Sequence, residues 1–164
     1  MRTRRSRSRP ARMEDPSDIR NWQRRPDGIT TSGRLEPGDP ARLAAIGIRH
    51  VVNLALADHP EALPDEAAAL AEQGIGYTHI PVAFDAPSHA QVAELASVLA
   101  NAEGPVHVHC IMNYRVTAFF YLLDIAAGVP EPEARARMAA IWDPLSSDDP
   151  RVAPWRALLA SSAP

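Results

Sequence analysis

Residues 106–120 read VHVHCIMNYRVTAFF, and this stretch decides the fold class. Gly104 and Pro105 turn the chain into VHVH, an apolar run of strand length that ends at Cys110. A loop from Cys110 to Arg115 follows, and then a strongly apolar helix, RVTAFFYLLDIAAG, which Gly128 stops. A strand that leads through a short loop into a helix is part of a βαβ unit, so the stretch predicts an α/β protein.

The same alternation of strands and helices continues on both sides of this stretch. We expect further strands at GITTS, HVVNLA and YTHIPV, and further helices at DPARLAAIG, EALPDEAAALAEQG, residues 88–102, EPEARARMAAIW and residues 152–160. Asp39 is the expected N-cap of the first of these helices, and Ser88 with Gln91 has the spacing of a capping box. The sequence thus predicts an α/β fold whose central, mainly parallel sheet of four or five strands is flanked by helices.

The length of 164 residues fits one domain and a short tail. Residues 1–12 carry six arginines and no acidic residue, which leaves 11 arginines against 20 acidic residues in the remainder. We expect residues 1–27 to be a basic and polar tail, disordered or loosely docked, and residues 28–164 to be a single domain. Residues 1–12 are interpreted as a solvated tail or as an upstream start before a true beginning at Met13, with an anion-binding arm as the alternative.

The composition also limits which kinds of binding partner and which cellular compartment are expected. An acidic body argues against a nucleic-acid-binding domain, and no window of 18 uninterrupted apolar residues or secretory signal is found. The single cysteine, Cys110, excludes an intramolecular disulfide and a cysteine-based zinc site and favours a reducing compartment. All 17 basic residues are arginine, as in GC-rich genomes. We therefore expect a bacterial, cytoplasmic protein that binds neither nucleic acid nor membrane.

The loop after the VHVH strand combines a cysteine with an arginine. Unpaired backbone N–H groups of the loop and of the first helical turn, together with the positive helix end, form a cradle for an anion and stabilise a thiolate. A planar guanidinium can hold two phosphate oxygens at once. Cys110 is therefore a candidate nucleophile rather than a merely buried apolar residue, and the candidate phosphate-binding residues are Ile111, Met112, Asn113, Tyr114 and Arg115.

HCIMNYRVT resembles the active-site loop of the cysteine-dependent protein tyrosine and dual-specificity phosphatases. The chain from about Asp18 to Trp155 resembles their small bacterial branch, the phosphatase-like or beta-lactamase-hydrolase-like domains, through DIRNW, ITTSGR, LAAIGIRHVVNLA, GIGYTHIPV, HCIMNYRVTAFF and AAIWDP. The resemblance implies a phosphatase-like fold and a hydrolase that cleaves a phosphorylated protein or small molecule through a phosphocysteine intermediate. No cofactor and no metal are expected, because the loop amides and the arginine supply the electrostatics.

The resemblance also implies a general acid on a loop that follows an earlier strand. YTHIPVAFDAPS places Asp85 there, so Asp85 is the candidate acid and, for hydrolysis of the intermediate, the candidate base. Aspartates often serve only as turn residues before a helix, and Asp58 and Asp65 lie on other loops near the same sheet edge. They remain alternatives.

Three further residues have expected supporting roles. The resemblance implies that Thr117, seven residues after Cys110, assists the departure of the thiolate. His109 is expected to support the thiolate indirectly. His107 shares the strand face of His109, but no third ligand stands at a suitable spacing, so we interpret both histidines as structural rather than metal-binding.

The spacing of the loop departs from the family pattern. Four residues separate Cys110 from Arg115, whereas the phosphatase superfamily has five and rhodanese-like sulfurtransferases have four. The loop has no glycine, although Asn113 can adopt a left-handed conformation at tolerable cost. Two alternatives to phosphatase activity are therefore a rhodanese-like sulfurtransferase with a Cys110 persulfide and a non-catalytic phosphate-binding module.

Overall fold

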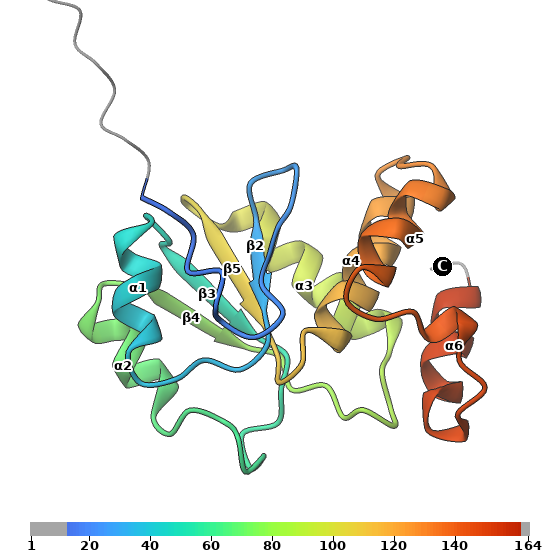
Figure 1. Cartoon of the computed structure of the whole chain (residues 1–164), viewed down its shortest axis with the longest axis horizontal. Coiled ribbons are helices and arrows are strands. Elements are labelled where there is room, and N and C mark those ends of the chain that lie inside the picture. The colour runs from blue at the N-terminus through green and yellow to red at the C-terminus, as the bar shows by residue number, and fades with distance from the viewer. Residues whose placement is uncertain (1–12, 162–164) are drawn as a thin grey trace, which may run out of the picture.

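A five-stranded sheet with the strand order β1-β2-β5-β3-β4 forms the centre of the computed structural model, which describes residues 13–161 (Figure 1). The strands are β1 (Gln23–Arg24), β2 (Thr30–Ser32), β3 (His50–Asn53), β4 (Gly76–His79) and β5 (Val106–His109). β1 runs antiparallel to β2, and every other pair of neighbours is parallel. The predicted mainly parallel sheet is therefore confirmed.

Helices cover both faces of the sheet. α1 (Asp39–Ala45) and α2 (Glu66–Glu72) lie on one face, and α3 (His89–Asn101) and α4 (Tyr114–Ala126) lie on the other (Figure 1). α5 (Glu131–Ala139) and α6 (Ala153–Ala160) contact α4, and two short 3₁₀ turns, Pro144–Ser146 and Pro150–Val152, connect them. No helix within residues 13–161 combines the length and the apolar character needed to cross a membrane.

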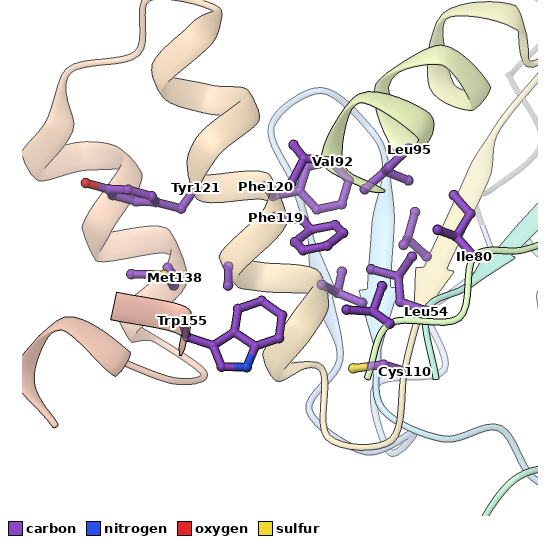
Figure 2. Packing of buried hydrophobic residues seen from close by; sticks show 14 of the residues in the cluster. Leu54, Ile80, Val92, Leu95, Cys110, Phe119, Phe120, Tyr121, Met138 and Trp155 are labelled. Carbon is purple, nitrogen blue, oxygen red and sulfur yellow. The ribbon is translucent and has the colours of Figure 1, made fainter. Parts of the chain in front are cut away.

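The alternation of side chains along each strand divides the core into two apolar clusters. In β3, Val51 packs with residues of α1 and α2, whereas Val52 packs with those of α3, α4 and α6. Figure 2 shows the larger cluster, in which Phe119 and Trp155 are fully buried and Cys110 lies at one edge. Because alternate residues of β5 belong to this cluster, the two histidines of β5 point toward the other face of the sheet.

Residues 15–25, which belong to the predicted tail, make contacts with the domain; residues 1–12 of that tail lie outside the described residues. Ile19 is buried in the cluster beneath α1, and the Trp22 ring stacks on the His107 imidazole with 5.1 Å between ring centroids. Arg25 Nη2 lies 2.6 Å from Asp124 Oδ1. Single aromatic and charged side chains hold this segment on the domain. Because they do not form a regular apolar pattern, the sequence did not predict the packing.

Two helices begin differently from the prediction, whereas the capping box of Ser88 is confirmed. Asp39 is the first residue of α1 rather than its N-cap, because its carboxylate accepts a hydrogen bond from Glu36 N at 2.7 Å and so closes the preceding turn. α2 begins only at Glu66, because Asp65 has a left-handed backbone with a φ of 52°. Pro64 therefore lies outside the first turn of α2.

Candidate functional site

The candidate loop lies at the carboxyl end of β5, the strand in the middle of the sheet. Cys110 follows β5 directly and is 1% exposed, and its sulfur points toward the side on which Trp155 lies (Figure 2). α4 begins at Tyr114, so Arg115 belongs to the first turn of this helix. Asn113 links loop and helix with a φ of 67°, the left-handed conformation expected from the sequence. The loop thus places Cys110 beside the N-terminus of a 13-residue helix.

The carbonyl groups of the loop are held from outside by the segments that follow β2 and precede β1. Arg34 N donates to Ile111 O at 2.9 Å, and Asn21 Nδ2 donates to Met112 O at 2.9 Å. The N–H of the next residue points away from the carbonyl in a trans peptide, and none of the described peptides is cis. The N–H groups of Met112 and Asn113 therefore point to the inner side of the loop.

These amides remain free to bind an anion. Within residues 13–161, no protein acceptor takes a hydrogen bond from the backbone N–H of any residue from Ile111 to Arg115. The positive end of the α4 dipole adds to their partial charges. A ring of such donors at a helix N-terminus is an anion-binding arrangement, as the sequence predicts.

Two contacts fix the geometry of this loop. Asn113 Nδ2 donates to Asn21 O at 2.8 Å and to Thr31 Oγ1 at 3.0 Å, which anchors the left-handed residue to β2. Gly33 lies so close to the loop that a Cβ atom there would be 2.5 Å from Ile111 O. Only glycine fits at position 33 without moving the loop, and the sequence alone does not reveal this constraint.

Arg115 carries the charge that a bound anion needs. Its Nε is buried and has no hydrogen-bond partner, and its guanidinium forms no ion pair with any acidic residue between positions 13 and 161. The guanidinium lies over the Phe84 ring, 5.8 Å from the centroid. A buried N–H donor without an acceptor is costly unless it binds a ligand, so the partly buried Arg115 is suited to an anion such as phosphate.

An aromatic cluster (Phe84, Tyr114, Trp142 and Trp155) joins the loop to the loop that carries Asp85. The Tyr114 ring stacks on Trp142 with 5.0 Å between centroids, and Phe84 packs against Trp142 at 5.8 Å and Trp155 at 5.7 Å. Trp155 Nε1 donates to Phe84 O at 2.7 Å. Asp85 follows Phe84 and is exposed. The structure therefore places the Asp85 loop beside Arg115.

His109 is buried behind the loop and lies against Glu66, a residue that the sequence did not indicate. His109 Nε2 lies 2.6 Å from Glu66 Oε1, and His109 Nδ1 lies 3.1 Å from Cys110 O. Glu66 is 7% exposed although it is a glutamate. It stands four residues before the buried Leu70 and so lies on the inner face of α2, a signal that could have identified it.

A family comparison adds to this geometry. A sequence model of the family described as "Beta-lactamase hydrolase-like protein, phosphatase-like domain" matches residues 23–127, more than half of the chain. This chain belongs to that family. No curated protein shows a match.

Solved structures with similar folds agree with this phosphatase-like assignment. A candidate phosphatase (DUF442) from Shewanella putrefaciens CN-32 is 31% identical with a TM-score of 0.71, over 87% of this chain and 91% of that one. A candidate phosphatase from Neisseria meningitidis Z2491 is 25% identical with a TM-score of 0.64, over 78% of this chain and 93% of that one. TpbA of P. aeruginosa, solved with phosphotyrosine, is 19% identical with a TM-score of 0.61, over 82% of this chain and 79% of that one. At this identity the likeness concerns the fold only, and it confirms the predicted phosphatase-like fold.

Thr117 makes a local hydrogen bond in the first turn of α4. Its hydroxyl donates to Tyr114 O at 3.2 Å, and its side chain lines a small cavity beside Arg25 and Asp124. No hydrogen bond joins Thr117 to Cys110 within residues 13–161, and the assistance of Thr117 to the thiolate stays a prediction. In the same range, no group of three or more His, Cys, Asp or Glu side chains could hold a metal ion.

Proposed function

We propose that this phosphatase-like domain hydrolyses phosphomonoesters through a phosphocysteine intermediate on Cys110. The observation that carries the proposal is the loop after β5. Across residues 13–161, its five backbone N–H groups have no protein acceptor, and the buried Arg115 Nε has no partner. A phosphoryl group presents three terminal oxygens that require such donors, and their charge is stabilised most where it develops in the transition state.

The first step transfers the phosphoryl group to sulfur. The Cys110 thiolate attacks phosphorus, and the S–P bond forms as the bond between phosphorus and the ester oxygen breaks. Asp85 donates its proton to the leaving oxygen, which departs as a neutral alcohol. Arg115 and the loop amides bind the three terminal oxygens throughout the step.

The second step releases phosphate. Water attacks the phosphorus of the phosphocysteine while the Asp85 carboxylate accepts a proton from that water. The S–P bond breaks with its electron pair returning to sulfur, so the Cys110 thiolate is regenerated and orthophosphate leaves. Each turnover therefore consumes one water and leaves both residues as they began.

The substrate in this proposal is a phosphorylated protein or small molecule, and an aryl ester suits the site best. Tyr114 and Phe84 border Arg115 on one side of the loop, and aromatic rings pack favourably on one another. TpbA, which has a similar fold, was solved with phosphotyrosine. We therefore infer that phosphotyrosine is a better substrate than phosphoserine.

Protection of Cys110 by phosphate tests the proposal. Iodoacetamide should alkylate Cys110 below about pH 8, where an ordinary thiol reacts slowly, and inorganic phosphate should slow the reaction. Arg115→Lys should lose this protection, because a point charge cannot replace the bidentate guanidinium. Arg151→Lys, at an exposed position, is the matched control and should be protected like the wild type. Protection that persists in Arg115→Lys, or alkylation that ignores phosphate in the wild type, contradicts the proposal.

The spacing of four residues between Cys110 and Arg115 supports sulfur transfer as a second candidate function. In that reaction the thiolate would take the outer sulfur of thiosulfate and release sulfite, and cyanide would then remove this sulfur as thiocyanate. Thiosulfate:cyanide transfer that exceeds hydrolysis of p-nitrophenyl phosphate would select this candidate. Tight phosphate binding with neither activity would select the non-catalytic module.

A further inference from the structure

The segment DIRNW, residues 18–22, lies against the outer side of the loop that follows β5. Ile19 is buried in the cluster beneath α1, and Gly33 N donates to Arg20 O at 2.7 Å. Trp22 stacks on the ring of His107. These contacts on both sides of Asn21 hold that residue in place facing the loop.

Asn21 and the loop exchange two hydrogen bonds. Asn21 Nδ2 donates to Met112 O at 2.9 Å, and Asn113 Nδ2 donates to Asn21 O at 2.8 Å. A carbonyl oxygen can only accept, so the amide nitrogen of each asparagine side chain must face its partner. Asn21 is therefore bonded to the residue on each side of the peptide bond between Met112 and Asn113.

The orientation of this peptide bond decides what the loop offers to an anion. The C=O and the N–H of a trans peptide point in opposite directions. With the Met112 carbonyl bonded to Asn21 on the outside, the N–H of Asn113 points to the inner side and can donate to an anion. If the peptide turned over, the carbonyl oxygen of Met112 would point inward and repel the anion.

The backbone of Asn113 favours the opposite orientation. Its φ of 67° is left-handed, a conformation that costs free energy in any residue other than glycine. A half-turn of the peptide would return this φ to the negative range that L residues prefer. The inward N–H of Asn113 therefore needs a contact that holds the Met112 carbonyl outside, and Asn21 supplies it.

We propose that Asn21 is a positioning residue of this site, which holds the peptide between Met112 and Asn113 so that the N–H of Asn113 faces the bound phosphoryl group. The inference rests on the proposed use of the loop as a phosphate site. Asn21 acts through the peptide and does not touch the substrate. Arg20 contributes less, because its Nη1 lies 3.5 Å from Ile111 O and pairs with Glu61 at 3.1 Å.

The affinity of the loop for inorganic phosphate tests the proposal. Asn21→Gly removes the donor, adds no charge and keeps a backbone that can adopt the φ of 51° found at this position. The phosphate concentration that half-protects Cys110 from iodoacetamide should rise about tenfold, which corresponds to about 1.4 kcal/mol.

Asn101→Gly is the matched control for this affinity. Asn101 is exposed at the end of α3, where its Nδ2 donates to a backbone carbonyl, Ser97 O, at 2.8 Å. This variant should be protected like the wild type. An unchanged phosphate concentration in Asn21→Gly, or an equal rise in Asn101→Gly, overturns the proposal.

A crystal structure of Asn21→Asp without phosphate tests the orientation itself. The new carboxylate has nearly the same size but can only accept hydrogen bonds, so it should repel Met112 O and bind the N–H of Asn113 instead. The Met112 carbonyl should then point inward and the φ of Asn113 should be negative. A Met112 carbonyl that still points outward overturns the proposal.

The wild-type protein crystallised with phosphate gives a readout that does not depend on the stability of any variant. A phosphate oxygen should lie about 3 Å from Asn113 N. Phosphate bound in the loop without this contact overturns the proposal. Failure of the proposed function is read separately, from the absence of phosphate protection in the wild type, and the Asn21→Asp structure still decides the role of Asn21 in that case.

Discussion

Arg115 and Asp85, which we propose to act with Cys110, occupy different kinds of position. Arg115 is fixed by the first turn of α4, and the left-handed Asn113 determines where that turn starts. Asp85 stands on an exposed loop whose anchor is the hydrogen bond from Trp155 Nε1 to Phe84 O. A residue on such a loop can move without disturbing the loop after β5, which suits the proton donor and acceptor that we propose for Asp85.

At Asp85, we expect substitution by Asn to lower kcat by about 10²- to 10⁴-fold on alkyl phosphates, with little change in KM. The loss should be much smaller for p-nitrophenyl phosphate, because its leaving oxygen needs no proton. Steady-state kinetics on both substrate types measure this difference. Asp58→Asn and Asp65→Asn, at exposed positions on neighbouring loops, are matched controls that should retain activity. Equal losses on both substrates would assign Asp85 to loop structure instead.

Site residues that are close together in the sequence could be predicted, whereas those that are far apart could not. Cys110, Asn113 and Arg115 are contiguous, and a strand-to-helix junction explains them without any tertiary information. Glu66 and Asn21 are distant in sequence and reach the loop only because β3, β5 and the segment before β1 are adjacent in space. Nothing local in the sequence distinguishes Glu66 from the exposed Glu72 except its register with Leu70.

At the scale of elements, β1 is attached to the helical layer by buried charges. The side chains of Arg25 and Asp124 are 8% and 7% exposed, and Arg137 Nη1 lies 3.3 Å from Asp124 Oδ2. The Arg25 guanidinium also lies over the Phe120 ring, 4.2 Å from its centroid. One carboxylate on α4 therefore holds cations from the β1–β2 turn and from α5.

Asp124→Asn should reduce the free energy of unfolding by about 3 kcal/mol, because Arg25 and Arg137 lose their buried carboxylate and keep only the more exposed Asp27 and Glu133. Asp149→Asn is the control: Asp149 pairs with an arginine whose side chain is 85% exposed, and removal of this surface pair should change stability little. Urea unfolding followed by circular dichroism compares the two variants. Similar stabilities would show that the buried charges contribute no more than a surface pair.

The elements that sequence patterns predicted are those with apolar runs. β3 and β5 are apolar enough to be recognised, α3 starts with a capping box, and α4 is strongly apolar and is followed by Gly128. β1 consists of Gln23 and Arg24 only, and it exists because β2 offers an edge to pair with. A strand of two polar residues has no signature in sequence, since its stability comes entirely from its neighbours.

For the whole molecule, His107 makes stability depend on pH. Its folded pKa lies well below the ordinary value of 6.5, because burial and the charge of His109 disfavour its charged form. The unfolded chain therefore binds a proton there that the folded chain does not. The stabilisation is fully present above about pH 6.5 and is lost as pH falls below it, by about 1.4 kcal/mol per pH unit.

Urea unfolding between about pH 7.5 and 5.5 measures this dependence. The wild type should lose stability more steeply than His107→Gln, by about one proton in the linkage slope. His50, whose pKa burial also lowers, is present in both proteins and cancels in the comparison. Parallel curves for the two proteins would mean that His107 binds its proton equally in the folded and unfolded chains.

The position of β5 in the sheet has a consequence for biosynthesis. β5 lies between β2 and β3, yet the chain makes β2, β3 and β4 before it. Thr31 and Val108 are partners in the sheet although they are far apart along the chain, so their pairing closes a long loop at an entropic cost. A chain still emerging from the ribosome has no continuous sheet until the segment that carries Cys110 has appeared. The complete sheet and the segment that carries Cys110 therefore become available at the same stage of synthesis.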